Sequence, residues 1–169
     1  LIHRPDALMD PDELADTFQG LKAAGKVRAF GVSNHTPSQL AMLHRRHPLV
    51  TNQIEFSPLQ MRALADGTLD QCTDLGLQPM VWSPLGRGRL FTADDVQAQR
   101  VRGVLEALAA AYGHSPATMA YAWILRHPSR PLPITVRATC ASISSEMPID
   151  GSSCCDCCSL SFSMERRIV

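Results

Sequence analysis

The sequence has no excess of charge of either sign. Its 16 Lys and Arg residues balance 16 Asp and Glu residues, so no net field attracts a polyanion or an anionic membrane surface. No uninterrupted apolar stretch approaches the roughly 20 residues that a membrane-spanning helix requires, and the opening segment Leu1–Asp6 lacks the layout of a signal peptide. We therefore expect a cytoplasmic protein with no nucleic-acid partner and no membrane partner.

Cysteine is nearly absent from most of the chain. Cys72 is the only cysteine before residue 140, and the other five of the 6 cysteines lie in the last 30 residues. The run Cys154-Cys155-Asp156-Cys157-Cys158 crowds its thiols together, whereas zinc sites use spaced ligand pairs. A disulfide framework is not typical of a cytosolic protein. We expect no metal site.

A doubly wound nucleotide-binding fold carries a glycine-rich turn after its first strand, and this sequence has none there. Up to Thr135 one unit recurs instead: a short apolar run, a polar loop, an amphipathic helix and a Gly or Pro stop. The runs are too short for helices and lack alternation, which indicates strands covered on both faces. They are Leu1 to His3, Val27 to Ser33, Thr51 to Phe56, Gln78 to Trp82 and Leu132 to Thr135.

The helices between these runs have explicit start signals. Asp10, Thr36 and Ser115 each precede a proline, which suits the first position of a helix. Glu13 and Gln39 stand three residues after a cap and predict two capping boxes. Two helices show an apolar face and a glycine stop. Their faces are Leu14, Phe18 and Leu21 before Gly25, and Val101, Val104, Leu105, Leu108 and Tyr112 before Gly113.

Strand–helix repeats of this length predict an α/β fold with parallel strands and right-handed crossovers. The strands could form an open sheet or part of a closed barrel, and periodicity does not choose between them. The cluster Gly86-Arg87-Gly88 follows the fourth apolar run, where a barrel places an active-site loop.

Polar residues gather where the apolar runs end, at His3-Arg4, Ser33-Asn34-His35, Asn52-Gln53 with Glu55, and Trp82-Ser83. In a parallel barrel these positions share one rim. Amide side chains suit a bound carboxamide because each offers a donor and an acceptor, and an aromatic side chain offers a flat face. The pattern predicts a pocket for a planar, amide-bearing ligand. The structural alternative is that His3 caps a strand, the amides brace turns and Trp82 belongs to the core.

Four consecutive segments resemble signatures of the aldo-keto reductases, in order and at the family's spacing. They are Leu1-Ile2-His3-Arg4-Pro5-Asp6, Gly31-Val32-Ser33-Asn34, Asn52-Gln53-Ile54-Glu55-Phe56-Ser57-Pro58-Leu59 and Trp82-Ser83-Pro84-Leu85-Gly86-Arg87-Gly88. The resemblance covers residues 1–135. It implies the C-terminal part of a (β/α)8 TIM barrel, from the fourth strand to the eighth, with outer helices.

The resemblance also implies an activity, namely hydride transfer between NAD(P)H and a small aldehyde or ketone. In the family a Tyr acts as general acid, a Lys and an Asp tune it, and a His orients the carbonyl. Only the His has a counterpart here, His3. The cofactor is expected to be NADP(H), with NAD(H) as the alternative. Ser33, Asn34 and Gln53 match the residues that hold the nicotinamide carboxamide, Trp82 matches the ring that stacks on it, and Ser83, Leu85, Gly86 and Gly88 match the loop along the pyrophosphate.

From Val136 on, the sequence departs from the family pattern. A Gly-x-Gly-like turn and a basic residue would be expected, but Val136-Arg137-Ala138-Thr139-Cys140 and then Ser and Cys clusters follow. We interpret residues 136–169 as an irregular, disordered tail produced by a frameshift. The opening at Leu1 with an uncapped apolar pair predicts a strand cut in the middle. The fragment is therefore expected to be inactive. Two alternatives remain, a non-catalytic cofactor-binding regulatory barrel subunit and a gene remnant without function.

Overall fold

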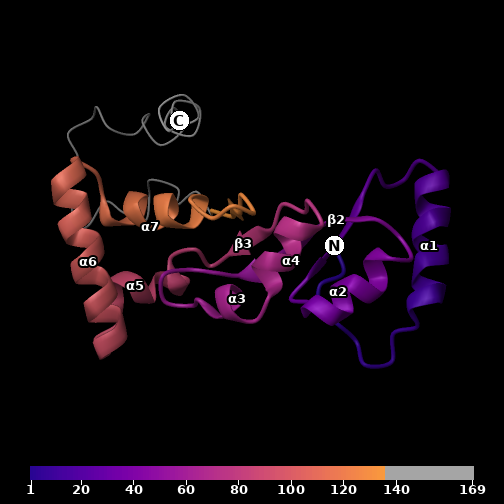
Figure 1. Cartoon of the computed structure of the whole chain (residues 1–169), viewed down its shortest axis with the longest axis horizontal. Helices are drawn as coiled ribbons and strands as arrows, with labels where there is room; N and C mark the ends of the chain where they lie inside the picture. Colours follow the sequence, from indigo (N-terminus) through magenta and orange to yellow (C-terminus); the bar gives the residue numbers. More distant parts are fainter. Residues whose placement is uncertain (136–169) are drawn as a thin grey trace, which may run out of the picture. The chain divides into compact units, whose positions relative to one another are not determined.

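The computed structural model of the chain describes residues 1–135, which form one compact unit. The predictions for the segment from Val136, including its cysteine run, lie outside the described residues. Helices cover strands in this unit, as Figure 1 shows. None of its helices has the length and apolar character that crossing a bilayer requires.

The strands are β1 (Phe30–Ser33), β2 (Leu49–Glu55), β3 (Met80–Trp82) and β4 (Leu132–Pro133). They pair in chain order, and every pair is parallel. Ile2 adds a single parallel bridge beside Val32. Its N–H donates to the Gly31 carbonyl at 3.0 Å, and its carbonyl accepts from the Ser33 N–H at 2.8 Å. The predicted order of adjacent parallel apolar runs is confirmed. β1, β3 and β4 are shorter than their runs, whereas β2 begins two residues earlier than its run.

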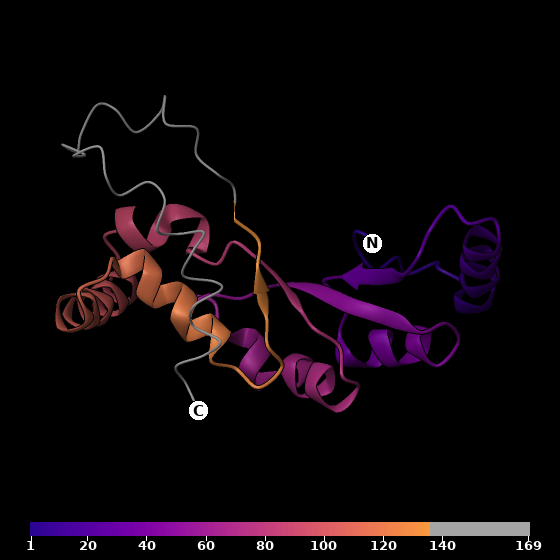
Figure 2. The same ribbon diagram turned by 90° about the horizontal axis from the view of Figure 1, so that it is seen from above.

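The helices alternate with the strands, and Figure 2 shows α2 and α4 on the same side of β1 and β2. The longer helices are α1 (Pro11–Ala23), α2 (Pro37–His44), α4 (Thr68–Asp74), α6 (Val96–Tyr112) and α7 (Pro116–Leu125). The short ones are α3 (Arg62–Ala65), α5 (Arg89–Thr92) and the 3-10 turn Gly86–Gly88.

Local capping chemistry explains where these helices begin. The Thr36 hydroxyl accepts from the Gln39 N–H at 3.4 Å, and the Gln39 side chain accepts from the Thr36 N–H at 2.9 Å, so this capping box is confirmed. Of the two hydrogen bonds that define the capping box predicted at Asp10, the structure of residues 1–135 has only the one from the Glu13 N–H to the Asp10 side chain. Asp10 accepts from the Asp12 and Glu13 N–H groups, but the described chain shows no return bond from the Glu13 side chain. One carboxylate already satisfies two of the free N–H groups at this helix end.

The core lies between the helices and one face of the sheet. Val32 packs in a cluster with Phe18 and Leu40, while Ile54 and Val81 pack in a second cluster that includes Ile124 of α7. Each such side chain contributes about 1.5–3 kcal/mol when it is fully removed from water. Val32, Ile54 and Val81 thus mark the helix-facing side of three neighbouring strands.

The predicted apolar face of α6 is partly wrong. Val104 is 57% exposed and Tyr112 is 69% exposed, whereas Leu105 is buried together with Ala98 and Ala109. Leu105 belongs to a cluster with Leu90 of α5 and Ala120 of α7. Small side chains let helices approach closely, so α6 packs through Leu105 together with Ala98 and Ala109.

A bulge in β2 sets which residues face away from the helices. Phe30 pairs with Leu49 and Val32 pairs with Asn52, so two steps along β1 match three along β2. Leu49 and Ile54 consequently both face the helices, and Gln53 and Glu55 occupy the opposite face. Gly31 lies beside the bulge. A Cβ there would meet the Thr51 Cγ2 at 2.6 Å and the Thr51 carbonyl oxygen at 2.9 Å, so only glycine fits.

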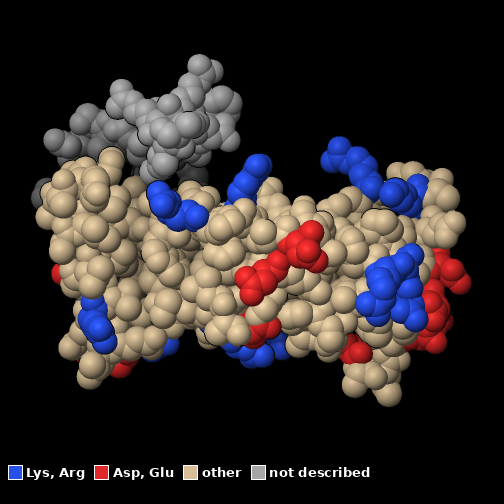
Figure 3. Space-filling model, viewed as in Figure 1, with Lys and Arg blue, Asp and Glu red and all other residues tan. Residues whose placement is uncertain are grey.

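Charged side chains of both signs are intermixed on the face of this unit shown in Figure 3. The ion pairs of the described residues include Arg46–Asp12, which links the end of α2 to α1, and Arg89–Asp95 at the start of α6. No broad basic area is visible on this face.

Candidate functional site

The C-terminal ends of β1, β2 and β3 bring the predicted site residues to one edge of the sheet. Ser33 pairs with Gln53, and Glu55 pairs with Trp82. The Asn34 N–H, just past β1, donates to the Gln53 carbonyl at 2.9 Å. Parallel strands place their C-terminal ends on the same side, which is why four residues far apart in sequence become neighbours.

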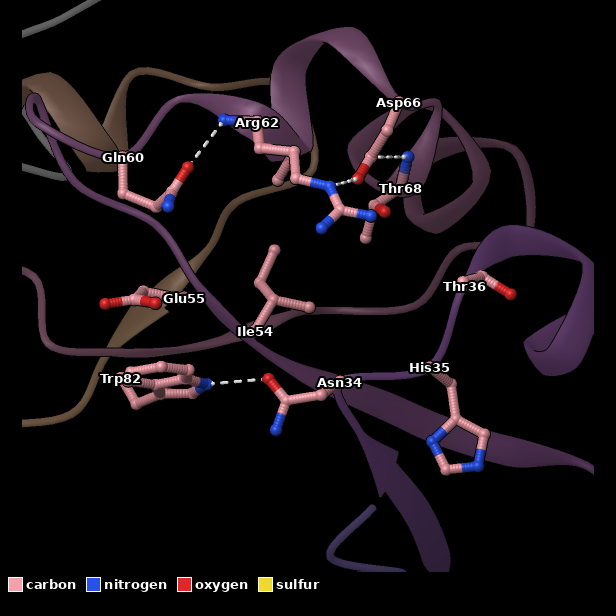
Figure 4. Close-up of a pocket in the computed structure, with 11 residues that line it drawn as sticks. Asn34, His35, Thr36, Ile54, Glu55, Gln60, Arg62, Asp66, Thr68 and Trp82 are labelled. Atoms are coloured by element: carbon pink, nitrogen blue, oxygen red, sulfur yellow. Dashed lines mark hydrogen bonds and ion pairs between the residues drawn. The ribbon is translucent and has the colours of Figure 1, made fainter. Parts of the chain in front are cut away.

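A chain of side-chain hydrogen bonds ties this edge together, and its first bond is drawn in Figure 4. The Trp82 indole N–H donates to Asn34 Oδ1 at 3.0 Å. Asn34 Nδ2 donates to the Ser33 hydroxyl at 3.0 Å, and this hydroxyl donates to the Gln53 carbonyl at 3.0 Å. Ser33 is only 3% exposed. Its hydroxyl therefore braces the amide of Asn34, and the indole ring is held in a fixed plane.

The backbone beside Trp82 adopts conformations that L residues rarely take. Asn34 has φ 57° and Ser83 has φ 52°, and each directly follows a strand at this edge. Left-handed backbone at residues other than glycine costs about 1–3 kcal/mol and clusters at functional sites. Two strained residues on either side of one indole ring mark this edge as a site independently of the side-chain types.

Gln53 and His3 are the polar side chains left free at this edge. Gln53 is half-buried on the face away from the helices, and its amide makes no hydrogen bond with another residue of the described segment. His3 is exposed, and it follows Ile2, which is bridged to Val32. One amide donor, one amide acceptor and one imidazole thus remain available to a ligand.

The loop after β3 is a tight left-handed turn. Gly86, Arg87 and Gly88 have φ values of 61°, 58° and 83°, and the Gly86 N–H donates to the Ser83 carbonyl at 2.9 Å. Leu85 packs against the cluster of Leu90, Leu105 and Ala120, so it anchors the loop to the helices. Of the predicted loop residues, Ser83, Gly86 and Gly88 shape the backbone, while Leu85 holds it in place.

A cavity of about 180 Å³ opens between the loops that follow β1 and β2. Figure 4 shows Trp82, Glu55 and Asn34 on one side of it and the Arg62–Asp66 ion pair on the other. Its lining residues are Asn34, His35, Thr36, Ile54, Glu55, Gln60, Arg62, Ala63, Asp66, Thr68 and Trp82. Most of the lining residues carry polar side chains, whereas the larger part of the exposed wall is apolar.

Of these polar lining residues, Asn34, His35 and Glu55 belong to the polar segments that the sequence predicted to converge. Gln60, Arg62 and Asp66 carry no such signal, since their position depends on how the chain folds after Pro58. Asn52, although adjacent to Gln53, is 1% exposed and donates to the His35 carbonyl at 2.9 Å. It braces the turn before α2.

Other candidates lie away from this edge. Tyr112 is on α6 and Tyr121 on α7, as expected for helix residues that do not act as the proton donor. Trp123 packs on Phe56 with ring centroids 5.1 Å apart. Within residues 1–135 no three His, Cys, Asp or Glu side chains converge as they would around a metal ion.

The comparisons with known proteins agree with this geometry. The model of the aldo/keto reductase family matches residues 1–145, and the chain belongs to that family. The segment from Val136, which we predicted to fall outside the family, is thus matched as far as residue 145. Its departure from the family stays a prediction.

Two curated relatives define the similarity more closely. The oxidoreductase YdhF of Escherichia coli (strain K12) is 54% identical over 138 residues, which is 79% of this chain and 45% of YdhF. A 6-dehydroglucose reductase of Novosphingobium aromaticivorans is 44% identical over 135 residues, which is 79% of this chain and 44% of that enzyme. The chain spans about half the length of the curated relatives it matches.

A solved structure shows the same fold. The aldo/keto reductase from Klebsiella pneumoniae, crystallised in complex with NADP and acetate, superposes with a TM-score of 0.69 at 24% identity. The match covers 89% of this chain and 53% of that one. The parallel sheet with its outer helices is accordingly part of a (β/α)8 barrel, as predicted.

Proposed function

We propose that this chain forms the nicotinamide-binding side of an NAD(P)H-dependent reductase that acts on a small aldehyde or ketone. The observation that carries the proposal is the braced Trp82–Asn34–Ser33 chain beside the unpaired amide of Gln53. A nicotinamide carboxamide needs both a donor and an acceptor, and its ring needs a flat face. The residues present fit that group.

Each side chain has a separate role in this proposal. Gln53 and Asn34 bind the carboxamide, Trp82 supports the ring, and the loop from Ser83 to Gly88 follows the pyrophosphate. NADPH is the expected form of the cofactor, with NADH as the alternative, and when bound it supplies the hydride. His3 donates a hydrogen bond to the carbonyl oxygen and orients it. Because its imidazole is exposed at the same edge, it can reach a substrate there.

Neither tyrosine of the described residues follows a strand at this edge, since Tyr112 lies on α6 and Tyr121 on α7. We therefore propose that the 169-residue chain alone is inactive in the cytoplasm and that turnover needs residues it does not supply. Binding of cofactor without turnover is the alternative function. The polar side chains that line the cavity beside Trp82 and the similarity to a 6-dehydroglucose reductase support a hydroxylated carbonyl substrate.

A chimera tests the proposal directly. The part of YdhF that precedes its matched segment is joined to Leu1, and NADPH oxidation is followed with simple and hydroxylated aldehydes. The chimera is expected to reduce aldehydes, and the 169-residue chain is not. A chimera that binds NADPH without turnover would favour the non-catalytic alternative, and an active 169-residue chain would contradict the proposed division of roles.

Two variants of the chimera separate the roles. Gln53→Ala should weaken NADPH binding about tenfold, the effect of losing roughly one to two hydrogen bonds. His3→Ala should mainly lower kcat, because it acts on the carbonyl in the transition state. Gln78→Ala is the matched control, since this amide precedes β3 at the opposite end of the sheet and donates to the Arg130 carbonyl at 2.9 Å. Unchanged binding in Gln53→Ala would overturn the assignment.

A further inference from the structure

One face of Trp82 is covered by a cation from the chain itself. The guanidinium carbon of Arg87 lies 5.1 Å from the centroid of the Trp82 ring, and Arg87 Nε lies 3.6 Å from Glu55 Oε1. Glu55 and Trp82 are register partners on β2 and β3. The two side chains therefore hold the guanidinium from neighbouring strands, and a planar ligand stacking on this face has to displace it.

The loop that carries Arg87 is not in a relaxed conformation. Arg87 has φ 58° between two left-handed glycines, a region that residues with a Cβ rarely adopt. Its side chain is 67% exposed, so both the ion pair and the cation–π contact are weakened by water. Both contacts are individually weak, so the covered state is easily reversed.

An Arg87 guanidinium that leaves Trp82 can bind the pyrophosphate of the cofactor. It sits in the loop proposed to follow the pyrophosphate, between two glycines that let the backbone turn. Guanidinium binds phosphate oxygens through paired N–H donors more strongly than it binds an exposed carboxylate at 3.6 Å.

We propose that Arg87 is a two-position latch. In the empty site its guanidinium covers Trp82 and pairs with Glu55. In the loaded site the guanidinium pairs with the cofactor's diphosphate, and the nicotinamide ring stacks on the indole in its place. This inference rests on the proposed function. Glu55 and the diphosphate compete for one guanidinium. The apparent affinity for the cofactor is therefore proportional to the fraction of chains whose Trp82 is uncovered.

The empty-site position is tested by NMR on the 169-residue chain. The Trp82 ring current should shift the Arg87 side-chain protons upfield, and Trp82→Leu should remove that shift. Glu55→Gln should reduce it. Shifts that are the same in all three proteins would overturn the covered state.

The loaded position is tested in the chimera with NADPH. Glu55→Gln should lower the Kd by up to about fivefold, the range of an exposed ion pair. Arg87→Gln should raise the Kd and flatten its dependence on salt concentration. The control is Arg46→Gln, which removes an exposed arginine paired with Asp12 far along the chain and should leave the Kd unchanged.

The outcomes also separate this inference from the proposed function. Binding of NADPH with the Arg87 signals unmoved, or a higher Kd in Glu55→Gln, would overturn the latch alone. A chimera that binds no NADPH would overturn both the latch and the nicotinamide site. Release of the upfield-shifted signals by NADPH together with tighter binding in Glu55→Gln would establish the latch.

Discussion

His35 is a buried titratable residue next to the site. Its side chain is 2% exposed, and Nδ1 lies 2.9 Å from the Ser33 carbonyl oxygen. The carbonyl accepts, so the proton is on Nδ1. Burial lowers the pKa of His35 from its ordinary 6.5, and the hydrogen bond to Ser33 offsets only part of that effect. Figure 4 shows the ring directed away from Arg62 and Asp66. Its role is to support the turn after β1.

This burial predicts a pH-dependent stability. Below about pH 6.5 the unfolded chain binds a proton at His35 that the folded chain does not. The free energy of unfolding should therefore fall as the pH falls from 6.5 towards the lowered folded-state pKa, by at most about 1.4 kcal/mol per pH unit. Urea unfolding at pH 7.5 and 5.5 measures this effect in the wild-type chain.

The comparison needs two variants. His35→Gln should lose this part of the pH dependence, and His114→Gln, at an exposed position after α6, should keep it. An identical pH dependence in His35→Gln and the wild type would show that another group is responsible.

For single residues, the sequence predicts where in the sheet a side chain lies better than it predicts which groups that side chain contacts. Trp82 could be placed at the sheet edge because it ends an apolar run, and Gln53 because it belongs to a polar group within the neighbouring run. That the Ser33 hydroxyl turns inward to brace Asn34 could not be predicted, because it depends on the register of β1 against β2. The left-handed backbone at Asn34 and Ser83 likewise arises from the surrounding structure.

Among the elements, α7 offers a clear test of packing on the sheet. Ile124 is fully buried in the cluster with Ile54 and Val81, while Leu125, the next residue, is 48% exposed. Ile124→Ala should lower the free energy of unfolding by roughly 2–5 kcal/mol because it leaves a cavity. Leu125→Ala is the matched control and should change it by less than about 0.5 kcal/mol. Equal losses in urea unfolding would mean that α7 is oriented differently.

Element starts were predictable because their bonds are local. The capping box at Thr36 involves only residues three apart. The buried face of α6 was not predictable from side-chain size, because it is set by Leu90 and Ala120 of neighbouring helices. Sequence patterns report what a helix could bury, and its neighbours determine what it does bury.

At the scale of the whole unit, one face of the sheet remains accessible to water. Leu1 is 59%, Val50 is 51% and Leu132 is 47% exposed. Within residues 1–135 no further strand pairs beyond Leu1–His3 or beyond β4. Exposed apolar groups on this scale bind other apolar surfaces. The order of the strands was predictable from repeated units, but which apolar residues stay exposed depends on how far the barrel closes.

The 169-residue chain should accordingly bind the apolar dye ANS, and the chimera with YdhF should bind less per molecule. Dye fluorescence at equal protein concentrations measures the difference. Val50→Thr in the 169-residue chain should reduce the signal, because it removes one exposed apolar group without changing the helix-facing side. Equal dye binding by the chain and the chimera would show that this face stays open in both.

Because of the bulge in β2, the arrangement of the site depends on the exact number of residues in this strand. Because one extra residue stands between Leu49 and Asn52, Gln53 and Glu55 face away from the helices, while Ile54 faces them. Deleting a single residue at the bulge would make the side chains after it change faces. Ile54 would then lie where the ligand amide is expected, and Gln53 would point into the hydrophobic core under the helices. A one-residue deletion in this strand looks minor in an alignment of relatives, but it would exchange the ligand-facing and core-facing side chains of β2.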